Sequence, residues 1–398
     1  MRVGLGQNTK TLTMGSKETA RVCLYGEHLA RALHEFCRVI WPGSSREIVP
    51  GQAIPASQAN TGQPSPPDAP TFVFLKDEKI VGHVTTIPVQ LSIPSGIKAA
   101  HWIVGFMVLP EYRSGLVGPL LIKEVNCVLD CAMSLHVELP VRRILTGLKW
   151  VHKGVLPQYL RVMNARGVLN NIQPSTVKAV SAGGRSSFLR PYLKSRCVRL
   201  IGSAGLALGQ RLWLGMNCLA RPKPILTDLQ WEEAFDDSYT HLWQSVAGQL
   251  GAALVRDRAA LESRYGGKIE GYRLLTCRRG KKLHGYCIVK LKQFLNDRRL
   301  GDMKLGTIVD CLYDPREPSV LHGLIAHVAQ WARQERVDAL LCTASLKSIG
   351  QGLLRNGFFT IPGNLNFAYH SRSPLELEKI SLDDWHLMRG DSDADQNF

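Results

Sequence analysis

The sequence predicts an α/β (α+β) fold built twice in tandem, each copy a mixed, largely antiparallel sheet flanked by helices. Its 398 residues exceed what one ordinary hydrophobic core holds, so two domains are expected. Strand and helix patterns also occur in the same order in both halves. The third observation is that glycine and proline landmarks recur at nearly one spacing, as a duplication predicts.

Periodicity predicts the elements of the first half in order. Residues 18–41 place apolar side chains at helical spacing, and residues 44–69 are rich in Pro, Gly, Ser and Gln, which favours a loop. The elements that follow are a hairpin of strands 71–75 and 80–93, a buried central strand 102–109 and a helix 118–135. Residues 172–228 are irregular and basic, and we interpret them as the connection between the halves.

The second half repeats this plan with a different local sequence. Its predicted elements are strands 272–277, 283–294 and 306–312, a helix 319–335 and a strand 339–343. Each half therefore reads as a hairpin, a central strand, a helix and a further strand.

Three landmarks support the duplication. Gly82 and Gly285 open the second hairpin strand of each half, 203 residues apart (285 − 82). Pro110 and Pro315 end the central strands, 205 residues apart (315 − 110). A third pair, Gly154-Val155 and Gly357-Phe358, follows a helical stretch in each half at a spacing of 203 residues (357 − 154).

Composition narrows the class of protein. Hydrophobic residues make up 45% and charged residues 21%, as in soluble globular proteins. The net charge of +16 indicates an acidic partner such as nucleic acid, an anionic membrane face or a phosphate-bearing cofactor. No nucleic acid is expected, because basic and aromatic residues do not interleave as they do in single-strand binders. We interpret the densest basic group, residues 185–199, as surface or as a contact with an anion.

The ten cysteines indicate a reduced, cytoplasmic protein without a metal site, because none forms a CxxC or a zinc spacing. Cys127 and Cys131 lie one helical turn apart and are expected to pack in the core. No secretory signal and no transmembrane span are expected. The most apolar stretch, residues 200–220, is interrupted by Gln210-Arg211 and is better suited to an inter-domain helix.

A glycine-bearing turn between the first central strand and its helix is a candidate anion site. Residues 113–118 read Arg-Ser-Gly-Leu-Val-Gly. Amides at a helix N-terminus converge on an anion, and the helix dipole adds positive potential. Arg113 can add a phosphate contact, and Pro119 suits the first helical turn, where no amide donor is needed.

The order Val-x-Pro-Glu-Tyr-Arg, glycine turn and helix resembles the coenzyme A diphosphate motif of the GNAT superfamily, Arg/Gln-x-x-Gly-x-Gly/Ala. Arg113 matches its first position and Gly118 its last, while Leu116 stands where glycine is usual. The resemblance implies that acetyl-CoA or another acyl-CoA is a co-substrate. By the same resemblance the backbone of Met107 and Val108 pairs with the pantetheine arm, and the diphosphate is bound at Arg113, Ser114, Gly115, Leu116, Val117 and Gly118.

The resemblance covers about residues 70–165 and 265–370, where residues 353–358 are similar to the family's late helix-x-Gly-Phe element. The second copy lacks the glycine turn, since Arg316-Glu317-Pro318 follows its central strand, and we expect it to be degenerate. The expected domains are an acyl-CoA-binding domain 1–175, a connecting segment 176–228, a degenerate domain 229–375 and a flexible acidic tail 376–398.

Catalytic groups are sparse in the pattern. Many GNAT members place a glutamate base early in the central strand, where this chain has His101 and Trp102. His101 is the candidate base, with a strand-edge or surface histidine as the alternative. The usual tyrosine acid is replaced by Trp150 and Leu353. Asp310, a charge inside an apolar run, is either a site residue facing a cleft or a salt-bridged core residue.

The sequence thus predicts a cytoplasmic, metal-independent acyltransferase that moves an acetyl or other acyl group from acyl-CoA to an amine acceptor. The alternative is a catalytically degenerate GNAT-like binding or scaffold protein. The acceptor, the acyl length and the oligomeric state stay open.

Overall fold

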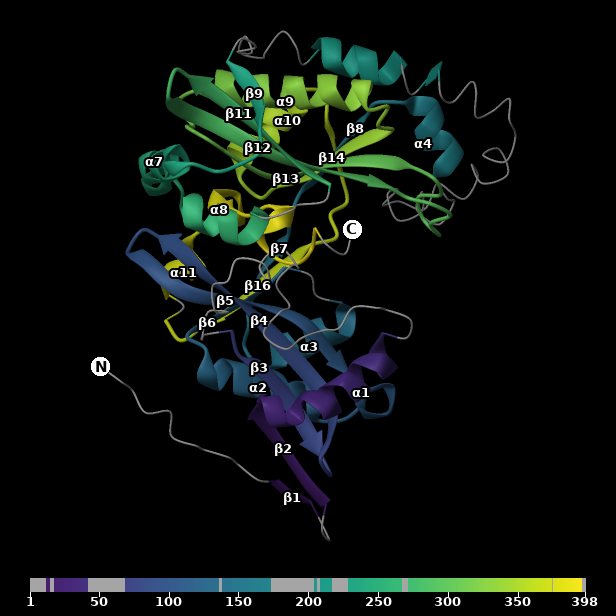
Figure 1. Ribbon diagram of the computed structural model, residues 1–398, viewed down its shortest axis with the longest axis vertical. Coiled ribbons are helices and arrows are strands. Elements are labelled where there is room, and N and C mark those ends of the chain that lie inside the picture. Colours follow the sequence, from purple (N-terminus) through teal and green to yellow (C-terminus); the bar gives the residue numbers. More distant parts are fainter. Residues whose placement is uncertain are drawn as a thin grey trace. The chain divides into compact units, whose positions relative to one another are not determined.

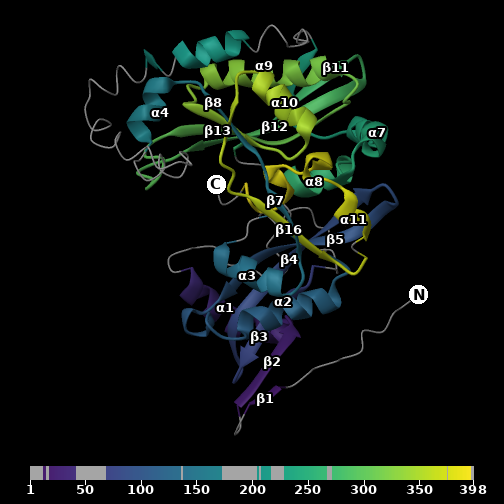
Figure 2. The same ribbon diagram turned by 180° about the vertical axis from the view of Figure 1, so that it is seen from behind.

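A computed structural model describes residues 12–14, 18–41, 69–135, 138–172, 204–205, 208–216, 228–266, 271–373 and 375–395. The chain divides into two compact units (Figures 1 and 2). Unit 1 comprises Met1–Leu91, Ile97–Gly154 and Asn366–Lys379, and unit 2 comprises Ser92–Gly96, Val155–Leu365 and Ile380–Phe398.

Unit 1 contains a sheet whose strands follow the order β1-β2-β3-β4-β5-β6-β16-β7. β5 and β6 pair in parallel, whereas β1 to β4 pair antiparallel in succession and β16 pairs antiparallel with β6. The strands are β1 (Leu12–Met14), β2 (Glu18–Leu24), β3 (Thr71–Lys76), β4 (Lys79–Ile93), β5 (Gly96–Val108), β6 (Cys131–Ser134), β7 (Val151–Val155) and β16 (Asn366–Ser371).

Helices cover both faces of this sheet (Figures 1 and 2). Alternate strand residues point to opposite faces of the sheet. On one face Leu33 and Phe36 of α1 pack against Val73 in an apolar cluster, called here the α1 cluster. On the other face Leu121 and Val125 of α2 pack in a second apolar cluster, the α2 cluster. The helices are η1 (Glu27–Leu29), α1 (Ala30–Ile40), η2 (Pro110–Tyr112), α2 (Val117–Val128), α3 (Leu139–Gly147) and α11 (Leu375–Lys379).

Unit 2 repeats the arrangement with the strand order β15-β8-β14-β13-β12-β11-β9, in which only β13 and β14 pair in parallel. Its strands are β8 (Gln158–Val162), β9 (Leu229–Glu232), β10 (Ala252–Leu254), β11 (Tyr272–Arg279), β12 (Lys282–Gln293), β13 (Lys304–Tyr313), β14 (Ala339–Thr343), β15 (Phe359–Ile361) and β17 (Trp385–His386). Its helices are α4 (Ala165–Asn171), α7 (Asp237–Val246), η5 (Ala247–Gln249), α8 (Arg258–Tyr265), α9 (Pro318–Gln334), α10 (Lys347–Arg355), η6 (Leu382–Asp384) and η7 (Arg389–Asp391).

One strand is exchanged in each direction between the two sheets. β8 follows β7 along the chain, yet it pairs with β14 in the sheet of unit 2. β16 comes late in the chain and occupies the corresponding place beside β6 in unit 1. The boundaries expected at residues 175, 228 and 375 stay a prediction. They divide the chain into consecutive segments, whereas the strand exchange places β16, from late in the chain, in the sheet of unit 1.

The duplication is visible in the contacts of two predicted landmarks. A Cβ on Gly82 would lie 2.7 Å from Val117 Cγ1 and 3.4 Å from Met107 O, and one on Gly285 would lie 2.8 Å from Val320 Cγ1 and 3.0 Å from Leu312 O. Both glycines therefore let a helix approach the second hairpin strand closely. The two units correspond with an offset of 203 residues in this strand and 205 in the central strand.

The third landmark pair is wrong. Gly357 follows α10 with a φ of 81°, and the residue that follows α3 in the same way is Lys149, with a φ of 61°. Trp150 N bonds to Leu145 O just as Phe358 N bonds to Leu353 O, which fixes the correspondence. Gly154 lies inside β7 instead. The sequence misled because lysine fills a left-handed helix end where glycine is usual.

Two predicted helices were drawn too long. Residues 18–24 form β2, in which Ala20 and Val22 contact the α2 cluster and Cys23 the α1 cluster, a period of two. The predicted helix 118–135 ends at Val128, and Cys131–Ser134 is β6, so Cys127 and Cys131 do not share a helix. A continuous apolar run does not distinguish a buried helix from a buried strand.

The interpretation of the acidic end as a flexible tail is also wrong. Residues 375–395 carry α11, β17 and η7, and Trp385 and Asp391 are fully buried. The predicted loop 44–69 lies outside the described residues except for residue 69, as does all of 185–199. Of residues 200–220, the structure describes 204–205 and a helical stretch, 208–216. Among the helices that the structure describes, none is long and apolar enough to cross a membrane.

Candidate functional site

The two parallel strands of unit 1 part early. β5 and β6 pair at His101–Ala132 and Trp102–Met133. Past Trp102, no pairing of β6 with the remaining residues of β5, 103–108, is found in the described part of the chain. The sheet is thus open between these strands toward the C-terminal end of β5.

A bulge interrupts β5 within this open stretch. Ile103, Phe106 and Val108 all contact the apolar cluster under α2, although the step from 103 to 106 breaks the two-residue alternation of a strand. Gly105 supplies the extra residue with a φ of 57°, a left-handed conformation that favours glycine. A Cβ at Gly105 would lie 3.6 Å from the ring carbon Cε1 of His83 on β4.

The turn after β5 leads directly into the N-terminus of α2. The 3₁₀ turn η2 is followed by an exposed turn and then by α2, whose N-cap residue Leu116 provides no side-chain cap. The first intrahelical bond runs from Leu120 N to Leu116 O. The amides of Val117 and Gly118 precede any helical acceptor, and Pro119 has no donor. This helix start can therefore receive an anion.

The predicted cofactor residues all lie along this path. Arg113, Ser114, Gly115 and Leu116 are exposed, while Val117 and Gly118 are buried at the helix start. A Cβ at Gly118 would meet Ile144 Cδ1 at 3.1 Å and Phe106 Cζ at 3.3 Å, so a small residue is needed there.

Side chains at the strand end point to different clusters. Arg113 Nε donates a hydrogen bond to Val108 O at 3.0 Å, which ties the turn to the end of β5. Met107 packs with the α1 cluster, whereas Val108 packs with the α2 cluster. Contacts of these residues with acyl-CoA stay a prediction.

His101, the candidate base, lies at the paired beginning of β5, opposite Ala132 and four residues before the bulge. Its side chain is half-buried. Its catalytic role stays a prediction.

His83 is a candidate that the sequence interpretation missed. Its side chain is only 1% exposed, and its ring packs against Phe36 at 5.3 Å and Trp41 at 6.0 Å between ring centroids. Burial lowers its pKa to about 4, so the imidazole is neutral near pH 7. Nδ1 is buried without a hydrogen-bond partner among the described residues. The only signal in the sequence was its place beside the landmark Gly82.

Unit 2 has the same opening in its sheet. The parallel pairing of β13 with β14 ends at Ile308–Cys342, and β13 bulges between the partners of Ile288 and Val289. By the offsets of 203 and 205 residues, Tyr286 stands at the place of His83 and Asp310 at the place of Gly105.

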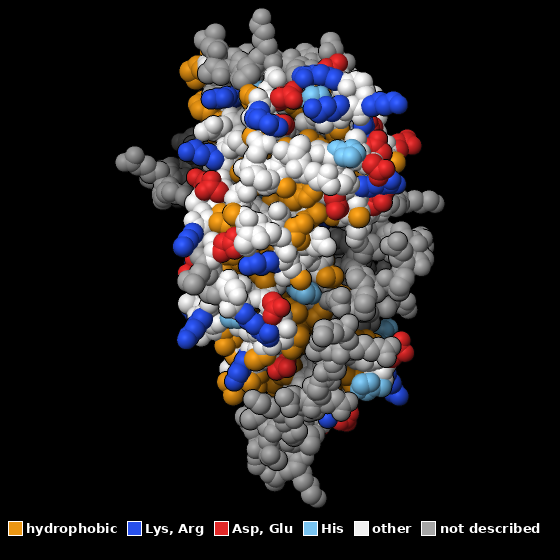
Figure 3. Space-filling model, turned by 90° about the vertical axis from the view of Figure 1, so that its left-hand side faces the viewer, with side chains coloured by type: hydrophobic (Ala, Val, Ile, Leu, Met, Phe, Trp, Pro, Cys, Tyr) orange, Lys and Arg blue, Asp and Glu red, His pale blue; other side chains and the backbone are white. Residues whose placement is uncertain are grey.

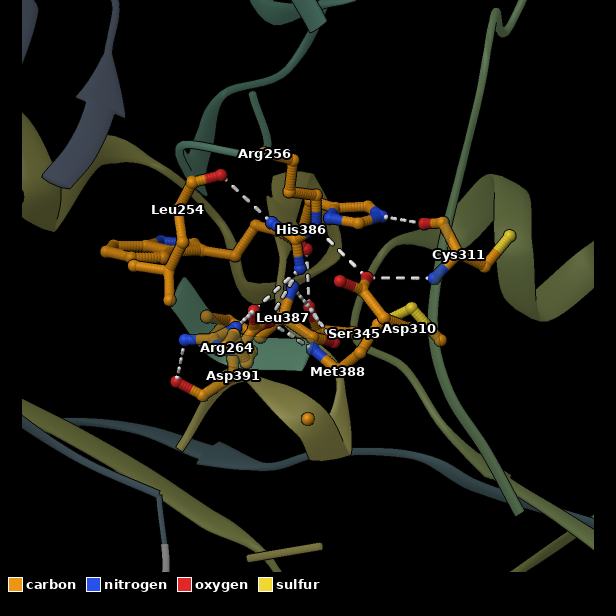
Figure 4. A network of polar contacts seen from close by, with 12 residues as sticks. Leu254, Arg256, Arg264, Asp310, Cys311, Ser345, His386, Leu387, Met388 and Asp391 are labelled. Carbon is orange, nitrogen blue, oxygen red and sulfur yellow. Dashed lines mark hydrogen bonds and ion pairs between the residues drawn. The ribbon is translucent and has the colours of Figure 1, made fainter. Parts of the chain in front are cut away.

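In unit 2 the chain itself fills this opening (Figure 4). Met388 forms a β-bridge with Ala344, just past the end of β14, and Ser345 N donates to Leu387 O at 2.9 Å. On the other side, the carbonyl oxygen of Cys311 in β13 accepts a hydrogen bond from His386 Nε2 at 2.9 Å. The segment from His386 to Met388 therefore lies between the two parted strands.

A buried ion network holds this segment in place. Arg256 Nε is 3.0 Å from Asp310 Oδ1, Arg256 Nη2 is 2.7 Å from Asp391 Oδ1, and Arg264 Nη1 is 2.9 Å from the same oxygen. The side chains of Arg256, Asp310 and Asp391 are 1% exposed or less. Asp310 is thus the salt-bridged core residue, one of the two alternatives that the sequence left open.

The pKa values of the two carboxyl groups in the network are shifted in opposite directions. Burial raises the pKa of Asp310 despite the attraction of Arg256. Burial also disfavours the charged form of Asp391, but Arg256 and Arg264 outweigh it and hold the pKa of that carboxyl below its usual range.

A carboxylate occupies the helix start of unit 2. Glu317 is the N-cap residue of α9, and its oxygens lie 2.8 Å from Arg279 Nη1 and 2.8 Å from His284 Nδ1. The glycine turn expected to be missing is replaced by Arg316-Glu317-Pro318, and the Glu317 carboxylate adds a negative charge beside the helix start without a hydrogen bond to the helix amides. This charge disfavours an anion.

Two other kinds of site bear on function, a metal centre and a basic patch. No group of three metal-binding side chains gathers among the described residues. On the face drawn in Figure 3, Lys and Arg side chains are interspersed with acidic ones rather than collected in one patch.

Comparisons with known proteins bear on the fold. No protein-family model and no curated protein sequence matches this chain. A solved structure from Enterococcus faecalis V583, a conserved protein of unknown function described as a probable N-acyltransferase, matches with a TM-score of 0.51 and 10% identity, covering 88% of this chain and 72% of that one.

This match shows that the chain shares the fold of that protein, with mixed sheets flanked by helices in two units. Saccharomyces cerevisiae N-myristoyltransferase with bound myristoyl-CoA matches at a TM-score of 0.46 and 13% identity, covering 78% of this chain and 70% of that one. A GCN5-related N-acetyltransferase from Anabaena variabilis matches at a TM-score of 0.47 and 11% identity, covering 75% and 62%. At such identities the likeness concerns the fold, and the reaction needs its own evidence.

Proposed function

We propose that this protein transfers an acyl group from acyl-CoA to an amine acceptor, and that unit 1 binds the acyl-CoA. The observation that supports this proposal most is that β5 separates from β6 and leads, through the turn at residues 109–116, into the uncapped N-terminus of α2. A diphosphate at the amides of Val117 and Gly118 would leave the pantetheine arm beside residues 103–108 of β5. The residues proposed to bind the cofactor are Met107, Val108, Arg113, Ser114, Gly115, Leu116, Val117 and Gly118.

Unit 2 supports placing the cofactor in unit 1. There the corresponding opening holds His386 to Met388, and the helix start carries the Glu317 carboxylate. An acyl-CoA would have to displace a segment tied by the buried Arg256–Asp391 pair, which is costly.

A second candidate is a binding or scaffold protein with the same fold and no turnover. It is favoured by the residues near the ends of α3 and α10, where Leu145 and Leu353 occupy equivalent positions and neither side chain has an ionisable proton to donate to a leaving thiolate. Such a protein would keep acyl-CoA binding and release no thiol.

A reducing, cytoplasmic location is part of the proposal. The cysteines that the structure describes are free thiols, and Cys277, Cys287, Cys311 and Cys342 of unit 2 are buried. Buried free thiols are typical of proteins kept in reducing compartments.

The test is calorimetric titration of the full chain with acetyl-CoA and, separately, with myristoyl-CoA, followed by thiol release over a panel of amines. We expect a dissociation constant of micromolar order for at least one acyl-CoA, together with amine-dependent thiol release. Absence of binding at millimolar ligand overturns the acyltransferase proposal. Binding without thiol release over the whole panel selects the scaffold protein.

A further inference from the structure

We propose that His83 is a catalytic residue of this reaction, and that its imidazole takes the proton from the acceptor amine at the Gly105 bulge. This inference rests on the proposed function and adds a residue on β4, outside the turn and outside the central strand.

At the bulge, β5 places no side chain against the buried imidazole. The place where a Gly105 side chain would stand is 3.6 Å from Cε1 and 4.0 Å from Nε2 of His83. Because glycine has no side chain, this edge of the ring is not covered from β5. A group that lies over β5 at Gly105 can therefore come within hydrogen-bond reach of Nε2.

The other sides of the ring are apolar. Phe36 and Trp41 pack against it, and Val73 is its partner across β3. A buried polar group without a partner costs free energy, on the order of 1–3 kcal/mol. In native proteins such a group usually has a reason, of which a catalytic role is one.

Unit 2 shows what this place becomes when its opening is filled. Tyr286 replaces His83, and Asp310 replaces Gly105 and binds Arg256. The unit with a side chain at the bulge, unit 2, thus lacks the histidine. The unit with glycine at the bulge, unit 1, has it.

The proton transfer balances without a further reactant. The amine nitrogen bonds to the thioester carbonyl carbon, and the carbon–sulfur bond breaks with its electron pair leaving on the CoA sulfur. The proton of the nitrogen passes to Nε2 of His83. The imidazolium then protonates the thiolate, so the products are the amide and free CoA, and His83 is neutral again.

The experiment measures thiol release from acetyl-CoA and from myristoyl-CoA by the full chain, with hydroxylamine as the amine probe. We expect His83→Gln to lower kcat by about 100-fold, the scale of general-base catalysis, with the dissociation constant for acyl-CoA within about threefold of wild type. Free imidazole should restore part of the rate to His83→Ala, which a purely structural role would not allow. Tyr286→Phe, the matched change in unit 2, should leave kcat unchanged.

If the His83 variants do not fold, Gly105→Ala tests the same geometry, because its methyl group would cover the ring edge and lower kcat at retained acyl-CoA binding. A wild-type rate in His83→Gln overturns the role of His83 and leaves the acyltransferase standing. Wild-type protein that binds acyl-CoA and releases no thiol to hydroxylamine also overturns it. Protein that binds no acyl-CoA overturns the proposed function instead.

Discussion

Units 1 and 2 open their sheets at the same place and treat the opening in opposite ways. In unit 2 the strands part after Ile308–Cys342, and the segment from His386 to Met388 fills the space. In unit 1 they part after Trp102–Met133, and no described segment pairs there. Backbone groups where strands part need partners, so the comparison teaches that the copy without an internal partner is the one suited to a ligand.

The largest expected effect is a loss of stability when the ion network that holds residues 386–388 in unit 2 is broken. Arg256→Met leaves Asp310 and Asp391 buried without their shared cation, and we expect a loss of about 3–5 kcal/mol in the free energy of unfolding. Chemical denaturation followed by tryptophan fluorescence measures it. The control is the triple variant with Asp310→Leu and Asp391→Leu, which should regain much of the loss because the only charge left without its partner in the network is that of Arg264, whose side chain is 22% exposed. A loss below about 1 kcal/mol for the single variant would contradict the structural role of the network.

The next largest effect is a dependence of the stability of unit 2 on pH. The pKa of Asp391 is depressed in the folded protein, so its stabilising contribution is fully present above the unfolded value near 4 and is lost as pH falls through the lower folded value. We expect the thermal midpoint of unit 2 to fall in that window. Asp391→Asn should already be less stable at pH 7 and should lose less between pH 5 and pH 2. Parallel curves for the two proteins would refute the assignment.

The smallest effect sharpens the comparison at the helix starts. Leu116→Asp places a carboxylate at the N-cap position of α2, the position that Glu317 holds in α9. We expect acyl-CoA binding to weaken about tenfold through repulsion of the diphosphate, while stability stays equal or rises by about 0.5–1 kcal/mol because aspartate is a good N-cap. Calorimetry and thermal unfolding measure the two effects separately. Ser319→Asp, in the first turn of α9 and 203 residues after Leu116 (319 − 116), should leave binding unchanged. Equal weakening by both variants would refute an anion site in unit 1.

Much of the fold could be predicted because it depends on local pattern. The hairpins, the central strands and the spacing of Gly82 and Gly285 follow from period-two alternation and from close helix approach. The strand β2 was misread because a short apolar segment fits two periods at once.

What depends on distant partners could not be predicted. The acidic end looks solvated in its own sequence, yet Asp391 is bound by Arg256, 135 residues earlier, and by Arg264, 127 residues earlier. The candidate turn at residues 113–118 was visible in the sequence, because its chemistry lies in consecutive amides. His83 was not, because nothing in its own segment places it beside the bulge at Gly105.

The strand exchange has a consequence for biosynthesis. The sheet of unit 1 needs β16, which emerges from the ribosome about 230 residues after β6 (366 − 134). At ordinary elongation speeds that delay is on the order of tens of seconds. Throughout it the nascent chain exposes the unpaired edge of β6, a template for wrong pairing, so the N-terminal half made alone would be a substrate for chaperones.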